Sequence, residues 1–182
     1  MATEEIEVLE LGEDLLDANN VSDRTVILAE IAGEPVFQKR TITYNDKETG
    51  EERSFPKVEL KWTIKQIHPE TSAGSRDLFI NISRAQAEAL ESGKSPSMHA
   101  KTDLGRLTRQ CSDAGLPNPG SSDLVGKVVV VASFTEEFRG RTERKYDILA
   151  TVGDVEDFDL ERGVAIVQDE ALASKQQVSA AY

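Results

Sequence analysis

The stretch FPKVELKWTIKQI, residues 55–67, alternates apolar and polar side chains with a period of two residues. Its apolar set is Val58, Leu60, Trp62 and Ile64. Its polar set is Lys57, Glu59, Lys61, Thr63 and Lys65. Because successive side chains of a β-strand point to opposite sides, the pattern predicts a strand with one face in the core and a lysine-bearing face in water. Trp62 belongs to the apolar set, so we expect it in the interior.

The segments on either side of this stretch predict further strands. Upstream, TVILAEIAG (25–33) and VFQKRTITY (36–44) are rich in β-branched and aromatic residues, which favours one strand with a bend or bulge near Gly33. The polar run NDKETGEER (45–53) predicts a hairpin with a long, charged tip. Downstream, RDLFINI (76–82) predicts a short third strand.

Two helices are expected after the third strand. Ser83 is well placed to cap a helix over RAQAEALESG, residues 84–93. Thr102 or Asp103 can cap a second helix, which Gly115 ends. The residues at helical spacing within this second helix are Leu104, Leu107, Cys111 and Ala114.

A second hairpin follows the helices, with strands in LVGKVVVVASF (124–134) and EEFRGRTERKYDILATV (136–152). The chain therefore shows three strands, then helices, then two strands. This order predicts a mostly β protein with some α: an OB-like Greek-key β-barrel with one or two helices between strands 3 and 4. We expect an acidic N-terminal segment over 1–22, the barrel domain over 23–152, and an acidic, partly flexible C-terminal segment over 153–182.

The charge of the chain is unevenly distributed. The net charge is −12, yet residues 1–22 carry seven acidic residues and no basic one, and residues 148–182 carry seven acidic and two basic residues. The region between them, 23–147, has 19 Lys and Arg against 19 Asp and Glu. The central region can therefore present a basic face although the whole chain is acidic.

The sequence lacks the motifs of catalytic and metal sites. Cys111 is the single cysteine, and His68 and His99 lie in unrelated surroundings without metal-ligand spacing. Phosphate-binding glycine loops and the G-x-S-x-G nucleophile motif are absent. The acidic cluster Asp154, Glu156, Asp157 and Asp159 lacks the glycine and bidentate glutamate of an EF-hand, and a solvated acidic face explains it better. We expect a protein that is not an enzyme and uses no metal or cofactor.

The N-terminus has no basic region ahead of its apolar residues, which are interrupted by acidic ones, and no apolar run approaches about 18 residues. The sequence therefore predicts no secretory signal and no membrane partner. We expect a cytoplasmic protein, in the host cytoplasm if the protein is viral.

Basic and aromatic residues gather where nucleic acid could bind. Lys57, Lys61 and Lys65 recur on one face of the predicted strand. A second group lies in the later hairpin and consists of Arg139, Arg141, Arg144 and Lys145. Such positions suit contacts with backbone phosphates. Tyr44, Phe55 and Phe138 lie near the predicted hairpin tips, where they could stack on bases.

Residues 102–149, TDLGRLTRQCSDAGLPNPGSSDLVGKVVVVASFTEEFRGRTERKYDIL, carry a resemblance to a known family. They resemble the latter half of phage-type single-stranded-DNA-binding and recombination-associated proteins, where a helix ending in A-G-L precedes a D-L-x-G-K strand. The following G-R-x-x-x-K-like turn is matched by Gly140, Arg141 and Lys145, and the likeness covers roughly residues 25–150.

The resemblance implies an OB-like barrel that binds single-stranded DNA. It also implies that an acidic terminal segment competes for the DNA groove and recruits replication or recombination proteins. This chain departs from the family by ending in SAAY, without acidic residues. A single barrel has a small footprint on a long strand, so a homo-oligomer or an accessory role fits as well.

Three functions compete on this sequence. The first is sequence-tolerant binding of single-stranded DNA in phage or bacterial DNA replication and recombination. The second is a virion structural or assembly protein whose barrel packs against copies of itself, and the third is an inhibitor that mimics DNA with its acidic residues. A basic groove would favour the first, whereas a mixed surface with apolar patches would favour the second.

Overall fold

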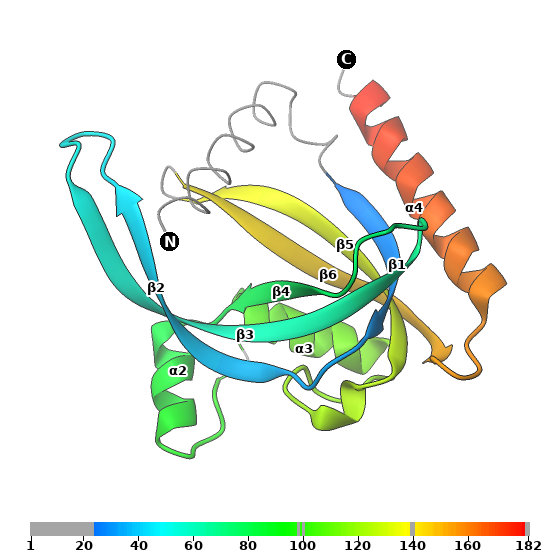
Figure 1. Ribbon diagram of the computed structural model, residues 1–182, viewed down its shortest axis with the longest axis horizontal. Helices are drawn as coiled ribbons and strands as arrows, with labels where there is room; N and C mark the ends of the chain where they lie inside the picture. The colour runs from blue at the N-terminus through cyan, green and yellow to red at the C-terminus, as the bar shows by residue number, and fades with distance from the viewer. Residues whose placement is uncertain (1–23, 98, 100, 139–140, 181–182) are drawn as a thin grey trace.

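Six antiparallel strands form one sheet that curls into half a barrel in the computed structural model (Figure 1). The structure describes residues 24–97, 99, 101–138 and 141–180. The strands are β1 (Thr25–Ile31), β2 (Val36–Asn45), β3 (Glu52–His68), β4 (Arg76–Asn81), β5 (Lys127–Phe138) and β6 (Arg141–Asp154). The helices are α2 (Arg84–Glu91), α3 (Asp103–Asp113), the short 3-10 helix η2 (Ser122–Leu124) and α4 (Leu160–Ala180). The predicted class, mostly β with helices on an OB-like curled sheet, is confirmed.

β3 organises the sheet because three strands pair with it. β2 and β1 follow one another along one side of β3, and β4 pairs along the other side. Between Ile31 and Val36 the chain advances five residues, while their partners on β3, Ile64 and Lys61, are three residues apart. Two extra residues therefore bulge out next to Gly33, whose added Cβ would lie 3.2 Å from the Thr63 Cβ. The predicted interruption near Gly33 is confirmed, although it divides the chain into two strands.

Both predicted helices form, with the expected caps. The Ser83 hydroxyl accepts a hydrogen bond from the Gln86 backbone N–H (3.2 Å), and the Gln86 side chain accepts one in return from the Ser83 N–H (3.0 Å). The Thr102 hydroxyl accepts from the Gly105 N–H (3.1 Å) at the start of α3. The two helices lie between β4 and β5, the third and fourth strands when β1 and β2 are counted as one.

The half-barrel is closed by a helix at the place where a full barrel would have a strand pair. β5 pairs with β1 and β6, but the described parts of β4 and β6 form no ladder with each other. Helix α3 lies along this open edge of β6. The Gln110 side-chain oxygen accepts from the Ile148 backbone N–H (2.8 Å), and Arg106 donates to the Tyr146 carbonyl (3.5 Å). These side chains satisfy edge groups that a neighbouring strand would otherwise pair.

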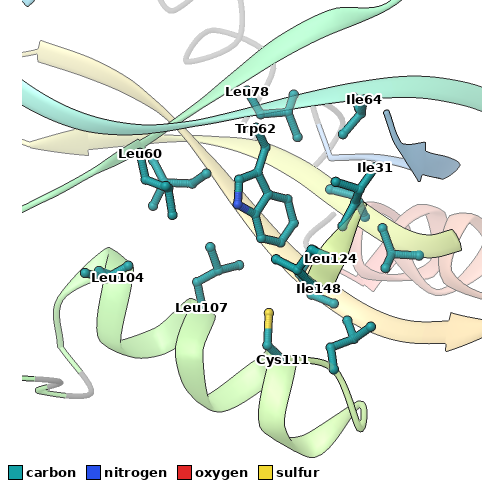
Figure 2. Packing of buried hydrophobic residues seen from close by; sticks show 14 of the residues in the cluster. Ile31, Leu60, Trp62, Ile64, Leu78, Leu104, Leu107, Cys111, Leu124 and Ile148 are labelled. Atoms are coloured by element: carbon teal, nitrogen blue, oxygen red, sulfur yellow. The ribbon is translucent and has the colours of Figure 1, made fainter. Parts of the chain in front are cut away.

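The interior of the half-barrel holds the main hydrophobic core. Trp62 is 1% exposed and lies among residues of β1, β3, α3 and β6 (Figure 2). Its indole N–H donates to the Pro119 carbonyl (2.8 Å), so the polar atom of this buried ring is satisfied. The alternation of residues 58–64 therefore places its apolar members as predicted.

A second core lies on the outer face of β1 and β5, under α4. The residues of this cluster are Val26, Leu28, Val128, Val130, Ala132, Val152 and Val167. Burial on both faces explains why residues 128–131 form an unbroken valine run instead of an alternation. An added Cβ on Gly163 would lie 2.8 Å from the Leu28 side chain, so glycine allows α4 to approach the sheet closely. The predicted acidic, partly flexible segment over 153–182 did not include a helix, and the structure adds α4 there.

Cys111 offers a test of this packing because it is the single thiol of the chain. It is 1% exposed, and burial raises its pKa from 9.0 to about 12. We expect a thiol reagent to leave the native protein unmodified and to modify one thiol on unfolding in denaturant. Rapid modification under native conditions would contradict this placement.

The same shift predicts a pH dependence. Because the folded state disfavours the thiolate, its contribution to stability is present below pH 9 and is lost as the pH rises toward 12. Between pH 8 and 10, Cys111→Ala is therefore expected to lose less stability than the wild type in denaturant titrations. An equal loss in both proteins would contradict the prediction.

Candidate nucleic-acid interface

The face of β2 and β3 that points away from Trp62 gathers basic and aromatic side chains, and we call it the ladder face. Its cross-strand pairs are Val36–Lys61, Gln38–Glu59, Arg40–Lys57, Ile42–Phe55 and Tyr44–Arg53. β4 adds Phe79 opposite Lys61 and Asn81 opposite Glu59. Because paired residues share a side of the sheet, Arg40, Arg53, Lys57 and Lys61 lie on the same side as Tyr44, Phe55 and Phe79.

Four of the residues predicted to bind DNA meet on the ladder face: Tyr44, Phe55, Lys57 and Lys61. The rings of Tyr44 and Phe55 pack edge to face with centroids 6.0 Å apart. The described residues place no carboxylate within ion-pair distance of Lys61. Lys65 lies on the same side of β3 but at its far end, where it pairs in register with Glu30 of β1.

The other predicted group, in the β5–β6 hairpin, is only partly described. Arg139 lies outside the described residues. Phe138 and Arg141 pair in register at the end of the two strands, and the structure describes only their backbone. Arg144 lines a small cavity beside Phe79, Asn81 and Tyr146, with room for about one water molecule.

Lys145 occupies a different environment from the one expected of a phosphate ligand. Its ammonium group pairs with Asp103 at the start of α3 and with Glu143 (3.0 Å). Burial lowers the pKa of Lys145, but the hydrogen bonds and charges of Asp103 and Glu143 outweigh burial and raise it. Lys145 therefore has a structural role, because its ion pair with Asp103 joins β6 to α3. Because the Lys145 ammonium is already paired with two carboxylates, its surroundings give no support to the predicted phosphate contact.

Sequence reasoning missed three basic or aromatic residues of the ladder face, Arg40, Arg53 and Phe79, of which Arg40 and Phe79 contact each other. The Arg40 guanidinium lies over the Phe79 ring, 4.6 Å from its centroid. Arg40 comes from β2 and Phe79 from β4, and both pair with β3. The even spacing of Arg40 and Tyr44 was a usable signal for a shared face. Their alignment with Lys57 and Phe55 depends on the register of the hairpin, which the sequence did not provide.

Glu59 departs from the prediction that its face is in water. Its side chain is 1% exposed, at the centre of the ladder face. One carboxylate oxygen, Oε1, accepts from the Arg40 Nη2 (3.0 Å) and lies 3.8 Å from the Lys57 Nζ. The other, Oε2, is buried without a hydrogen-bond partner. Removing a cationic partner of such a carboxylate would leave its buried charge uncompensated.

The part of the chain that the structure describes contains neither a metal-binding cluster nor a membrane-spanning helix. No group of three or more His, Cys, Asp or Glu side chains could hold a metal ion there. In the acidic cluster, Asp154 pairs with Lys127 (2.7 Å) and Asp159 accepts from the Arg162 N–H (3.0 Å) at the start of α4. Within the same residues, every helix is too short or too polar to cross a membrane.

The comparisons with known proteins leave the chain without an assigned family. No family model, no curated protein and no solved structure matches it. The resemblance to phage-type single-stranded-DNA-binding proteins therefore stays a prediction, and the geometry of the ladder face is what supports a function.

Proposed function

We propose that this protein is a non-catalytic, sequence-tolerant binder of single-stranded DNA, acting in phage or bacterial DNA replication and recombination in the cytoplasm of the cell. The observation that carries the proposal is the interleaving of basic and aromatic side chains on the ladder face. Single-strand binders combine cations that follow the backbone with rings on which bases stack, and every base has a face that can stack. OB folds bind oligonucleotides on the face of their second and third strands and on the loops beside them, and β3 and β4 hold these places when β1 and β2 are counted as one.

Each ladder-face residue has a separate task in this proposal. Lys57 and Lys61 contact phosphates. Tyr44 and Phe55 stack on successive bases near the hairpin tip. The β2–β3 hairpin extends away from the body of the protein, which lets a flexible strand follow it (Figure 1). Arg139, Arg141, Arg144 and Phe138 would add contacts from the second hairpin.

The remaining parts of the chain suggest partners. The acidic excess of residues 1–22 and 148–182 is suited to basic surfaces of replication or recombination proteins. Because one ladder face covers only a short length of DNA, several copies would bind a long strand together, as a homo-oligomer or side by side.

A virion structural or assembly role is the second candidate, and one observation favours it. Val36 and Phe37 are adjacent at the start of β2 and are 44% and 42% exposed. Contact between copies would remove such apolar side chains from water. The cations of the ladder face have no evident part in this role, which is why we place it second.

The test is fluorescence anisotropy with labelled single-stranded and duplex oligonucleotides at low and moderate salt. The wild type is expected to prefer the single strand and to weaken as salt rises. Lys61→Ala should lower the salt slope by about 0.7, the value for one phosphate contact on a single strand, and the pair Lys57→Ala and Lys61→Ala should weaken binding about tenfold. Tyr44→Ala should weaken binding about fivefold or more through lost stacking.

Lys39→Ala is the matched control, because Lys39 lies on the same strand but faces the other way and pairs with Glu91 of α2. It is expected to bind like the wild type. If the wild type binds no oligonucleotide even at low salt, the proposal is wrong and assembly becomes the favoured role.

A further inference from the structure

Glu59 is a buried carboxylate among the cations at the centre of the ladder face. The pairs on either side of it, Arg40–Lys57 and Val36–Lys61, place three cations within two residues of it along the sheet. Its Oε1 engages Arg40 (3.0 Å) and lies near Lys57 (3.8 Å). A negative charge at this position repels phosphates, so phosphate binding alone does not explain Glu59.

The carboxylate fixes Arg40 in a particular orientation. A charge-assisted hydrogen bond from Nη2 to Glu59 holds one end of the guanidinium, while its Cζ lies over the Phe79 ring, 4.6 Å from the centroid. Guanidinium planes and aromatic rings both stack on unpaired bases. Arg40 and Phe79 together therefore form a platform for a base.

The same carboxylate weakens the attraction of the face for phosphates. Its charge offsets one of the neighbouring cations, and its burial limits screening by salt. This reduction affects a duplex most, because B-DNA carries one phosphate charge per about 1.7 Å of its axis and keeps its bases inside. A single strand presents fewer charges per length, and its bases can reach the platform.

We propose that Glu59 is the residue that makes the ladder face select single-stranded over duplex DNA. It does so in two ways, by holding Arg40 over Phe79 as a stacking platform and by lowering the affinity for phosphates alone. This inference rests on the proposed function and adds to it the residue that sets its selectivity. Glu59 is a positioning residue, because it acts through Arg40.

Glu59→Gln tests the inference, because glutamine keeps the side-chain volume and an oxygen that can accept from Arg40 but removes the charge. Duplex affinity is expected to rise about fivefold and the duplex salt slope to steepen by about 0.9. Single-strand affinity should change less than about twofold, because the gain in charge is offset by a weaker hold on Arg40. The ratio of single-strand to duplex affinity therefore falls. A purely structural role would change neither the slope nor the ratio.

Arg40→Lys tests the platform separately, because lysine keeps the charge but has no plane to stack. Single-strand affinity is expected to fall about fivefold, with duplex affinity unchanged. If Glu59→Gln does not fold, as judged by its circular dichroism and Tm, this variant decides: an equal loss for both DNA forms overturns the inference.

Glu91→Gln is the control, because it removes the carboxylate that pairs with Lys39 on the opposite side of β2. Neither the slope nor the ratio should change in this variant. If the wild type prefers single strands and Glu59→Gln keeps the wild-type ratio and slope, the inference fails and the proposed function stands. If the wild type binds no DNA, the proposed function itself fails.

Discussion

Trp62→Ala is expected to lower the free energy of unfolding by about 4 kcal/mol, the largest effect of any single substitution considered for this protein. Trp62 is 1% exposed at the centre of the core in Figure 2, and its removal leaves a cavity between β3 and α3. It also leaves the Pro119 carbonyl without its indole donor. Denaturant unfolding followed by circular dichroism measures the change as a shift of the midpoint.

Trp62→Phe is the control for this prediction. Phenylalanine fills most of the volume but cannot donate to Pro119, so we expect a loss of about 1–2 kcal/mol from the unmade hydrogen bond and the smaller ring. Equal losses in the two variants would show that the hydrogen bond, and not the packing, carries the stability. A loss below about 1 kcal/mol for Trp62→Ala would place Trp62 outside the core.

Gln110→Ala is expected to lower the free energy of unfolding by about 2 kcal/mol. Gln110 makes two hydrogen bonds across the gap between α3 and β6: it accepts from the Ile148 N–H (2.8 Å) and donates to Asp147 (2.8 Å). Alanine leaves the backbone donor at the edge of β6 unpaired. Because the loss is local, the amide of Ile148 should exchange with solvent faster than its neighbours in β6.

Hydrogen exchange therefore distinguishes this role from a general loss of stability. Gln168→Ala, at an exposed position on α4, is the matched control and should leave both stability and the Ile148 exchange rate unchanged. If exchange at Ile148 is unchanged in Gln110→Ala, then α3 does not substitute for the missing strand, and the half-barrel must be closed in another way.

The alternation within β3 can be read from the sequence, but the pairing register of β2 and β3 cannot. The ladder face depends on both. Lys57 and Lys61 could be assigned to one face from their spacing alone, as could Tyr44 and Phe55 to hairpin positions. Arg40 could not be joined to Lys57, because that pairing depends on how many residues the turn contains. Phe79 comes from another strand, 39 residues beyond Arg40 in the chain, so only the folded sheet brings the two together.

The burial and the ion pairs of these side chains also depend on contacts that the local sequence does not show. Glu59 belongs to the polar set of its strand, and the local pattern predicts that it is in water. It is buried because neighbours from β2 and β4 flank it on both sides. Lys145 and Arg144 are adjacent and look equivalent in the sequence, yet only Lys145 pairs with Asp103 of α3. α4 was not predicted, and its Ile166 and Val167 pack in the cluster that β1 and β5 form.

The sequence by itself determined the period-two strand around Trp62, the caps of α2 and α3, the interruption near Gly33 and the class of the fold. These features depend on residues only a few positions apart, whose backbone preferences and alternation act locally. The tertiary structure alone decided the hairpin register, the closure of the half-barrel by α3, the docking of α4 and the burial of Glu59. Each of these depends on contacts between residues distant in the chain, which form only when the curled sheet brings its strands and helices together.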